Sequence, residues 1–174
     1  MKEELRKKAI EMRKSLNIAQ ISREICQKIC NIPVFIEAKS VGIFYPKEIE
    51  INLLSLCNLE KKDFYLPRTE SNFMEFYKFC GEESLKKGKF GILEPSLECK
   101  KGLPDLIIVP ALCADLQGFR LGWGKGFYDR YLKNYGGKIV CPVPDCLIYD
   151  KIPDETHDIC CDFVVSEKRI ITIS

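Results

Sequence analysis

The residues most clearly suited to binding or catalysis lie in one short segment, Gly118 to Gly126, where four glycines are interleaved with an arginine and a lysine. Glycine tolerates positive φ angles and lets the backbone approach a ligand closely. The segment is predicted to lie between a buried strand and a helix, where free backbone N–H groups favour an anion, most simply a phosphate chain. Arg120 and Lys125 add positive charge, and Asp129 just beyond them is suited to a cation or to a second ligand group. The sequence therefore predicts a phosphate-binding loop, with a flexible turn as the structural alternative.

The two common phosphate motifs do not describe this loop. A Walker A sequence needs Ser or Thr after its lysine, but Lys125 is followed by Gly126, and Phe119 stands where the first glycine belongs. The dinucleotide-binding fingerprint also fails, because the residue three after Gly126 is Asp129. A phosphate site here would be of another kind.

The elements that must position this loop follow from the spacing of apolar residues. Helical spacing predicts a helix from residue 2 to about 30, with Asn17 as a break between two short helices and an end at 31–33. A helix is also predicted over 51–57, and another from the glycine loop through Leu132 to 136–137. Residues 81–104 are rich in Gly and Pro and suit a loop that covers a site. Strands are predicted at 40–45, at 63–66 where Pro67 stops the run, at 72–79 on a sheet edge, and at 105–110, 139–141, 163–165 and 170–173.

Strands separated by helices favour an α/β fold. We expect a single domain over residues 1–174, with a central sheet layered with helices and the glycine-rich phosphate loop between a buried strand and a helix. The chain has 174 residues, within the usual size of one domain.

Composition excludes several classes of protein. The formal net charge is only +2, which gives no general electrostatic case for binding nucleic acid, and no apolar run approaches the length of a membrane span. The N-terminus has mixed charge and no apolar core of a secretory signal, so we expect a cytoplasmic protein whose ten cysteines form no disulfides. His157 is the only histidine and no C-x-x-C occurs, so any hard cation must be held by carboxylates.

The run RLGWGKGFYDRYL resembles the R-L-G-x-G-x-G-[YF]-Y-D-R motif of the 5-formyltetrahydrofolate cyclo-ligases. Further similarities follow in family order along nearly the whole chain, at 2–6, 41–48, 66–76, 105–112 and 153–158. The resemblance implies an ATP- and magnesium-dependent ligase that cyclises 5-formyltetrahydrofolate to 5,10-methenyltetrahydrofolate and releases ADP and phosphate. In this reaction ATP phosphorylates the formyl oxygen, N10 attacks the activated carbon, and phosphate leaves as the ring closes.

The resemblance also implies roles for individual residues. Arg120 and Lys125 would be catalytic. Both are expected to be exposed loop cations, so that substituting them leaves the fold intact. Asp129 and Asp158 would hold Mg²⁺. The reduced folate would be bound by Tyr45, Glu48, Arg68, Trp123 and Phe127. Glu48 would hydrogen-bond the pterin amino groups and Arg68 would attract the glutamate tail. ATP would be bound by Lys2, Arg6, Arg120, Leu121, Gly122, Trp123, Gly124, Lys125, Gly126, Phe127 and Tyr128.

Two other functions remain open from the residues. A sugar-phosphate isomerase or transferase could use the same loop for a phosphate ester, but it would need a general base, for which the chain offers Glu48 and aspartates. An RNA-binding module could use the basic N-terminal helix and the aromatics near Arg120, although the near-neutral charge weighs against it. The favoured expectation is an enzyme whose partners are ATP and a reduced folate, without nucleic acid or membrane, and a monomer or weak dimer.

Overall fold

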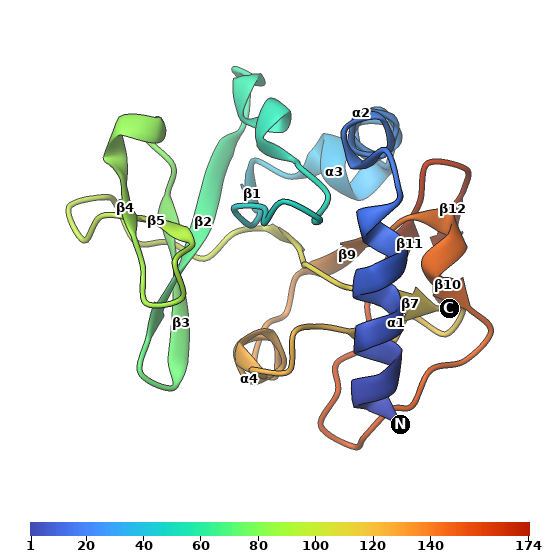
Figure 1. Cartoon of the computed structure of the whole chain (residues 1–174). Coiled ribbons are helices and arrows are strands. Elements are labelled where there is room, and N and C mark those ends of the chain that lie inside the picture. The colour runs from blue at the N-terminus through green and yellow to red at the C-terminus, as the bar shows by residue number, and fades with distance from the viewer.

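A seven-stranded mixed sheet forms the centre of the computed structural model, which describes residues 1–174 (Figure 1). The strand order is β12-β11-β9-β6-β1-β2-β3. Neighbouring strands from β11 to β2 are parallel, while β12 and β3 are antiparallel edge strands. The strands are β1 (Ser40–Gly42), β2 (Asp63–Glu70), β3 (Phe73–Lys78), β6 (Leu106–Ile108), β9 (Lys138–Pro142), β11 (Phe163–Val165) and β12 (Ile170–Thr172).

The remaining elements surround this sheet. The helices are α1 (Lys2–Lys14), α2 (Ile18–Ile29), α3 (Pro33–Glu37) and α4 (Phe127–Leu132), with short 3₁₀ turns at Leu54–Asn58, Glu82–Ser84 and Asp145–Leu147. A small three-stranded sheet contains β7 (Cys113–Asp115), β8 (Arg120–Leu121) and β10 (Ile148–Tyr149). A separate hairpin joins β4 (Leu85–Lys87) to β5 (Leu93–Pro95). No helix combines the length and apolar character needed to cross a bilayer.

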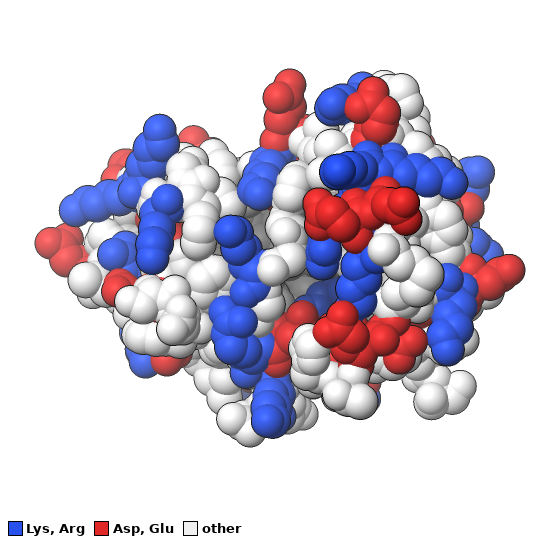
Figure 2. Space-filling view, turned by 60° about the horizontal axis from the view of Figure 1, so that its bottom comes forward, with Lys and Arg blue, Asp and Glu red and all other residues white.

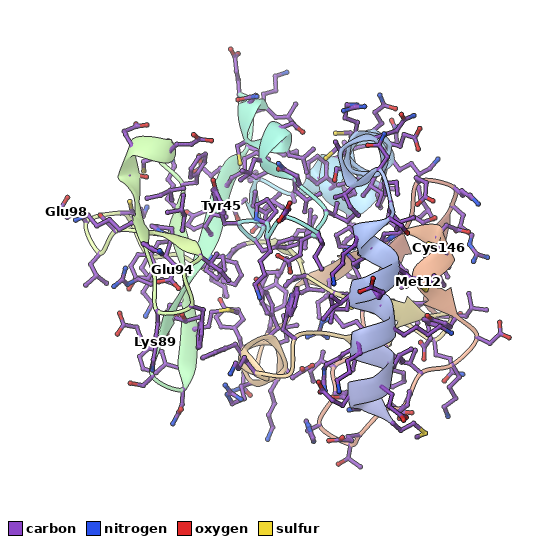
Figure 3. All side chains as sticks on the ribbon, viewed as in Figure 1. Met12, Tyr45, Lys89, Glu94, Glu98 and Cys146 are labelled. Atoms are coloured by element: carbon purple, nitrogen blue, oxygen red, sulfur yellow. The ribbon has the colours of Figure 1, made fainter.

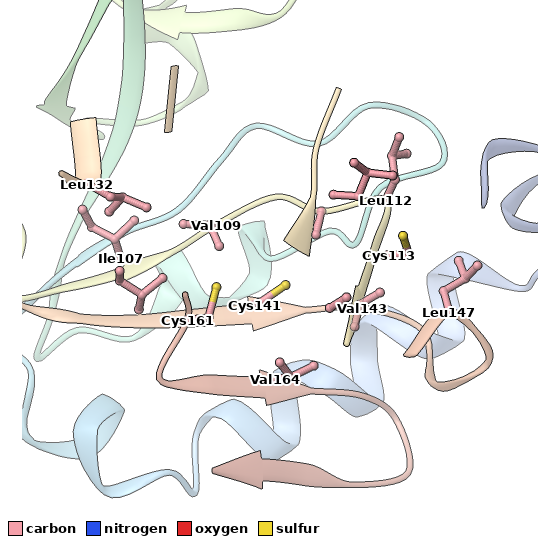
Figure 4. Close-up of a cluster of buried hydrophobic side chains, with 14 of the residues drawn as sticks. Ile107, Val109, Leu112, Cys113, Leu132, Cys141, Val143, Leu147, Cys161 and Val164 are labelled. Atoms are coloured by element: carbon pink, nitrogen blue, oxygen red, sulfur yellow. The ribbon is translucent and has the colours of Figure 1, made fainter. Parts of the chain in front are cut away.

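Helices cover both faces of the central sheet. Successive side chains of its strands point to opposite sides, so each strand contributes to a core on either face. In β6, Ile107 packs with α1 and α4, whereas Leu106 and Ile108 pack with α2 and α3. Figure 4 shows the first of these two clusters, in which Ile107 lies near Leu132 of α4 and Val164 lies further away on β11. The expected α/β domain with a central sheet layered with helices is confirmed.

The predicted break at Asn17 is also confirmed. The Asn17 side chain accepts a hydrogen bond from the backbone N–H of Gln20 at 3.2 Å and so caps α2. The predicted end of this helical segment at 31–33 is confirmed, since α2 ends at Ile29 and Ile32 has an extended backbone, but a further helix follows that the sequence did not predict. Proline is compatible with the first turn of a helix, and Pro33 begins the short helix α3.

Several element boundaries were wrong. The strand through residue 63 continues across Pro67 to Glu70; β1 pairs only with residues 63–65, so β3 is the sole neighbour at Pro67 and the missing N–H is tolerated. The run 40–45 is a strand only to Gly42, and the helix predicted at 51–57 is replaced by a short 3₁₀ turn at Leu54–Asn58. The strand at 72–79 is confirmed as an edge strand, and strands are also confirmed near 139–141, 163–165 and 170–173.

The largest difference lies between the strand near residue 106 and the glycine loop. The two short strands β7 and β8 are inserted there, so the strand that directly precedes the loop is the two-residue β8 of the small sheet. The following helix α4 ends at Leu132, before the paired glycines. Residues 81–104 are not entirely irregular, because they contain the β4–β5 hairpin.

Candidate active site

A cavity of about 670 Å³ opens beyond the carboxyl ends of β1 and β6, where Phe44, Tyr45 and Pro110 line it. The chain passes from β1 to β2 on one side and later returns to β6 on the other, so strand order reverses at this point. Ligands of open α/β sheets bind at such reversals. The volume falls in the range of about 300–1,000 Å³ that is typical of small-molecule sites.

The walls of the cavity come from segments far apart in the sequence. Figure 1 shows the β4–β5 hairpin on one side, α1 on the other and α4 below, and residues of all three line the cavity. Tyr45 lies in the middle of the molecule between Glu94 of the hairpin and Met12 of α1 (Figure 3). Lys and Arg side chains flank a central hollow on the lower face, with Asp and Glu at its margins (Figure 2). The site therefore combines a cationic rim with an interior in which apolar side chains lie beside a few buried charged ones.

Most of the residues expected to be functional lie on this one cavity. The glycine loop contributes Arg120 to Asp129 without a gap, and α1 contributes two cations that lie four residues apart on one helix face. The lining residues that the sequence predicted are Lys2, Arg6, Tyr45, Arg120, Leu121, Gly122, Trp123, Gly124, Lys125, Gly126, Phe127, Tyr128, Asp129 and Asp158. Glu48 and Arg68 do not line it.

The buried carboxylate of this region is Glu50 rather than Glu48. Glu48 is exposed, whereas Glu50 is only 5% exposed and lines the cavity. Glu50 Oε1 accepts a hydrogen bond from Trp123 Nε1 at 2.7 Å, and Oε2 accepts one from the backbone N–H of Lys47 at 2.7 Å. The sequence signal was two glutamates separated by one residue, which does not tell which of them turns inward.

Arg68 lies on the face of β2 that is directed away from the cavity. Its neighbours Pro67 and Thr69 line the cavity, and alternation along a strand sends the intervening side chain to the other face. The Arg68 guanidinium donates to the carbonyl of Pro95 at 3.1 Å and pairs with Glu70 at 3.1 Å. It thus attaches β2 to the hairpin instead of reaching a ligand.

Glu94 is a cavity residue that the sequence did not reveal. This 6% exposed carboxylate accepts hydrogen bonds from the Thr69 backbone N–H at 3.1 Å and from Thr69 Oγ1 at 2.7 Å. The hairpin is held against β2 by these bonds. No local pattern marks Glu94, because its partner lies 25 residues away.

Arg120 is a buried residue of β8 and not an exposed loop cation, which corrects the sequence expectation. Its side chain is 4% exposed, and it donates to the carbonyl of Ile159 at 2.9 Å and to Asp129 Oδ1 at 3.1 Å. Burial by itself lowers the pKa of the Arg120 guanidinium, but the nearby Cys161 thiol and Asp129 carboxylate outweigh burial and hold the pKa above its ordinary value. Arg120 therefore keeps its charge at the base of the cavity.

The glycine loop is held by α1 and carries one unpaired cation. Arg6 Nε donates to the carbonyl of Gly122 at 2.9 Å, and Gly124 and Gly126 have φ angles of +91° and +70°. Lys125 is exposed and forms no ion pair; its ammonium lies 5.6 Å from the centre of the Phe90 ring. A positive charge without a carboxylate partner is available to an anionic ligand.

At the other rim, Lys2 joins α1 to the segment that contains Asp158. Lys2 Nζ lies 2.8 Å from Asp158 Oδ2 and 3.1 Å from Glu155 Oε1. Burial alone would lower the pKa of Lys2, but its hydrogen bonds to Asp158 and Glu155 raise it overall. Burial likewise would raise the pKa of Asp158, but the hydrogen bonds from Lys2 and the Glu155 N–H lower it below its ordinary value.

The two carboxylates expected to hold a cation both line the cavity but are partly engaged. Asp129 Oδ1 accepts from Arg120 and from the Ile159 N–H, which leaves Oδ2 without a protein donor. Asp158 Oδ2 accepts from Lys2 and the Glu155 N–H. No group of three or more His, Cys, Asp or Glu side chains is arranged to hold a metal ion. The protein therefore provides at most part of a cation site.

The chain is similar over nearly its whole length to proteins of one kind. The model of the 5-formyltetrahydrofolate cyclo-ligase family matches residues 1–167. A probable 5-formyltetrahydrofolate cyclo-ligase of Schizosaccharomyces pombe is 31% identical across 86% of this chain and 85% of that protein. The 5-formyltetrahydrofolate cyclo-ligase of Haemophilus influenzae is 29% identical across 80% of this chain and 82% of its own length.

Solved structures agree with the sequence similarity. The NMR structure of Aquifex aeolicus 5,10-methenyltetrahydrofolate synthetase superimposes with a TM-score of 0.88 at 33% identity, covering 99% of this chain and 92% of that one. The Mycoplasma pneumoniae 5,10-methenyltetrahydrofolate synthetase, at 18% identity and a TM-score of 0.75, shares the fold. With a family model that spans every element lining the cavity, the chain belongs to the 5-formyltetrahydrofolate cyclo-ligase family, the ATP-dependent ligases that convert 5-formyltetrahydrofolate to 5,10-methenyltetrahydrofolate.

Proposed function

We propose that the cavity brings ATP and the reduced folate together so that the γ-phosphate meets the formyl oxygen beside Arg120 and Lys125. The observation that carries this proposal is the convergence of two unlike groups of residues on one cavity. The cations and glycine amides of α1 and the glycine loop line the same cavity as Glu50 and the aromatic rings of Tyr45, Trp123 and Phe127. The sugar-phosphate and RNA interpretations of the loop are abandoned, because family membership assigns the chain to the cyclo-ligases.

The phosphate half of the site is the segment from Arg120 to Tyr128 together with Lys2 and Arg6. Lys125 has no ion-pair partner, and positive φ at Gly124 and Gly126 leaves the loop backbone open to close approach. This geometry supports a glycine-rich phosphate loop before α4. Its affinity for phosphate would come from cations and amides, since α4 itself has only six residues.

The folate half is the region around Tyr45 and Glu50. A buried carboxylate that faces a cavity is suited to the N–H donors of a 2-amino-4-oxopyrimidine ring, which can offer two hydrogen bonds in one plane. Glu50 therefore takes the role that the sequence assigned to Glu48. Phe127 and Phe90 pack edge to face with ring centres 5.8 Å apart and form an aromatic wall of the same cavity.

Magnesium fits the residues that are present. Asp129 and Asp158 both face the cavity, and Mg²⁺ is usually held by one or two carboxylates together with substrate phosphates and waters. When bound, the ion would neutralise phosphate charge. A site made partly of ligand oxygens agrees with the absence of a three-residue metal cluster.

The reaction needs no protein nucleophile. The formyl oxygen would attack the γ-phosphorus while the bond from that phosphorus to the bridging oxygen breaks and ADP leaves. N10 would then attack the formyl carbon, and the carbon–oxygen bond would break to release phosphate as N10 loses its proton. Arg120 and Lys125 would stabilise the charge on the phosphoryl group during transfer, which is how proteins mostly catalyse this step.

One assay tests the proposal. The purified protein with 5-formyltetrahydrofolate and Mg-ATP should produce methenyltetrahydrofolate, followed by its absorbance, with one ADP formed per turnover. The Asp129→Asn variant should need more magnesium for half-maximal rate, because a hard-cation ligand has been removed. Cyclisation without ATP, or ATP hydrolysis that ignores the folate, would contradict the proposed coupling.

A further inference from the structure

Trp123 of the glycine loop is bound directly to the carboxylate of the folate half. Its indole Nε1–H donates to Glu50 Oε1 at 2.7 Å, and the Lys47 ammonium lies 3.6 Å from the centre of the indole ring. Lys47 also donates its backbone N–H to Glu50 Oε2 at 2.7 Å. One flat aromatic ring is thus held at its edge by a carboxylate and at its face by a cation.

This arrangement places the indole against Glu50 and uses one acceptor position on each of its oxygens. Glu50 is only 5% exposed, and each carboxylate oxygen already accepts a strong, short hydrogen bond. The indole occupies the Oε1 side of the carboxylate, so a ring that pairs with both oxygens from that side has to displace it. The Lys47 N–H belongs to the backbone of the same turn as Glu50, so the group that can leave is the Trp123 side chain.

The indole and a pterin ring present similar chemistry to a carboxylate. Both are flat and donate an N–H in the ring plane, but the pterin can offer two such donors to one carboxylate. Bidentate pairing is stronger than a single hydrogen bond, which lets the substrate prevail over the indole. A ring without these donors would have no such advantage.

We propose that Trp123 and the pterin ring of the reduced folate compete for Glu50, so that the folate must displace the indole in order to bind. The inference rests on the proposed role of Glu50. It assigns Trp123 a specificity role: only rings that bind Glu50 better than the indole can enter. The backbone can accommodate the movement, because a Cβ at Gly122 would meet nothing within 4 Å and Gly124 already has positive φ.

The competition has a consequence for the phosphate loop. Trp123 lies between Gly122 and Gly124, so its contact with Glu50 ties the loop to the folate half of the cavity. When the folate displaces the indole, the loop remains attached to α1 through the Arg6 bond to the Gly122 carbonyl. Folate binding therefore removes one of these two contacts of the segment proposed to bind ATP, the Trp123–Glu50 hydrogen bond.

A substitution that removes only the indole N–H tests the competition. Trp123 is the only tryptophan in the chain, so growth on benzothienylalanine replaces it alone with an isosteric ring that carries sulfur in place of N–H. The dissociation constant of 5-formyltetrahydrofolate is measured by calorimetry without ATP for the native protein, the benzothienylalanine protein and Trp123→Phe. Phe90→Leu serves as the matched control, since Phe90 lines the same cavity and does not touch Glu50 through a hydrogen bond.

We expect the folate to bind about tenfold more tightly to the benzothienylalanine protein, because a competing hydrogen bond to a charged group is lost. Trp123→Phe should change in the same direction, and Phe90→Leu should not tighten binding. Unchanged or weaker binding to the benzothienylalanine protein would overturn the competition. Glu50→Gln tests the role of Glu50 separately from the competition. A dissociation constant equal to that of the native protein would refute the role of Glu50 in folate binding. Weakened binding would support that role whether or not Trp123 competes with the folate.

Discussion

Arg120 and Asp129 form a partly buried ion pair beneath the glycine loop, with Arg120 Nη2 at 3.1 Å from Asp129 Oδ1. The pair joins β8 to α4 across the loop, and Ile159 contacts both partners through its carbonyl and its N–H. Two residues with separate expected roles, one for phosphate and one for a cation, are thus a single structural unit. The loop between them is held in shape at both ends.

Arg120→Ala should therefore lose stability as well as turnover. Removal of Arg120 leaves the Asp129 carboxylate and the Ile159 carbonyl without its hydrogen bonds, and losing such partners costs about 1–3 kcal/mol. Urea unfolding measures the loss. If Arg120→Ala had the same free energy of unfolding as the native protein, the pair would not stabilise the fold.

Lys125→Ala should behave in the opposite way. Lys125 is exposed and has no ion-pair partner, so its removal should leave the melting temperature unchanged. Turnover should fall by roughly 10²–10³, the usual loss when one charge-stabilising contact to a transition state is removed. Steady-state kinetics with a melting curve on the same sample check both parts, and normal turnover would remove Lys125 from the phosphate site.

Glu50→Gln and Glu48→Gln form a matched pair two residues apart. Glu50→Gln should raise the KM for 5-formyltetrahydrofolate by about 10- to 100-fold, because a charge-assisted pair becomes a neutral one. Glu48 is exposed and lies off the cavity, so Glu48→Gln should leave the KM within twofold. Equal effects of the two substitutions would contradict the assignment of Glu50.

Gly124→Ala should destabilise the loop, whereas Gly122→Ala should not. Gly124 has φ +91°, and a Cβ there would come within 3.3 Å of the Arg6 guanidinium carbon. A side chain in this conformation costs about 1–2 kcal/mol. At Gly122 a Cβ would meet open space. Melting temperatures of the two variants, compared with the native protein, test the difference.

The Lys2–Asp158 pair should stabilise the protein over a wide and definable pH range. The pKa of Asp158 is lowered in the fold, so its contribution is present above the unfolded value of about 3.9 and is lost as pH falls through the folded pKa. The pKa of Lys2 is raised, so its contribution is complete below the ordinary value of 10.5 and is lost as pH rises through the folded pKa.

Lys2→Met should consequently lower the melting temperature by a constant amount between about pH 5 and 9. The pair is partly exposed, so the loss should be about 1 kcal/mol or less. The difference from the native protein should shrink in more acidic and more alkaline solution. A difference that changes steadily through neutral pH would point to another titrating group.

The sequence by itself determined the family, the central strands and most of the cavity lining. These features depend on local patterns: apolar runs that must be buried, such as 106–108, and a glycine motif in which each residue has its own backbone requirement. The lining residues from Arg120 to Asp129 were predictable because they are contiguous, so placing one of them places the rest.

Only the tertiary structure decided which side chains face the cavity and which are occupied elsewhere. Glu50 replaced Glu48, and Arg68 turned away, because the direction of a side chain depends on strand register and turn geometry set by distant partners such as Trp123 and Pro95. The burial of Arg120 could not be predicted, because its acceptor, the Ile159 carbonyl, lies 39 residues further along the chain and meets Arg120 only in the folded protein. Spacing within the sequence encodes which residues are neighbours along an element, but the charge, burial and availability of each group are set by contacts that form when distant segments pack together.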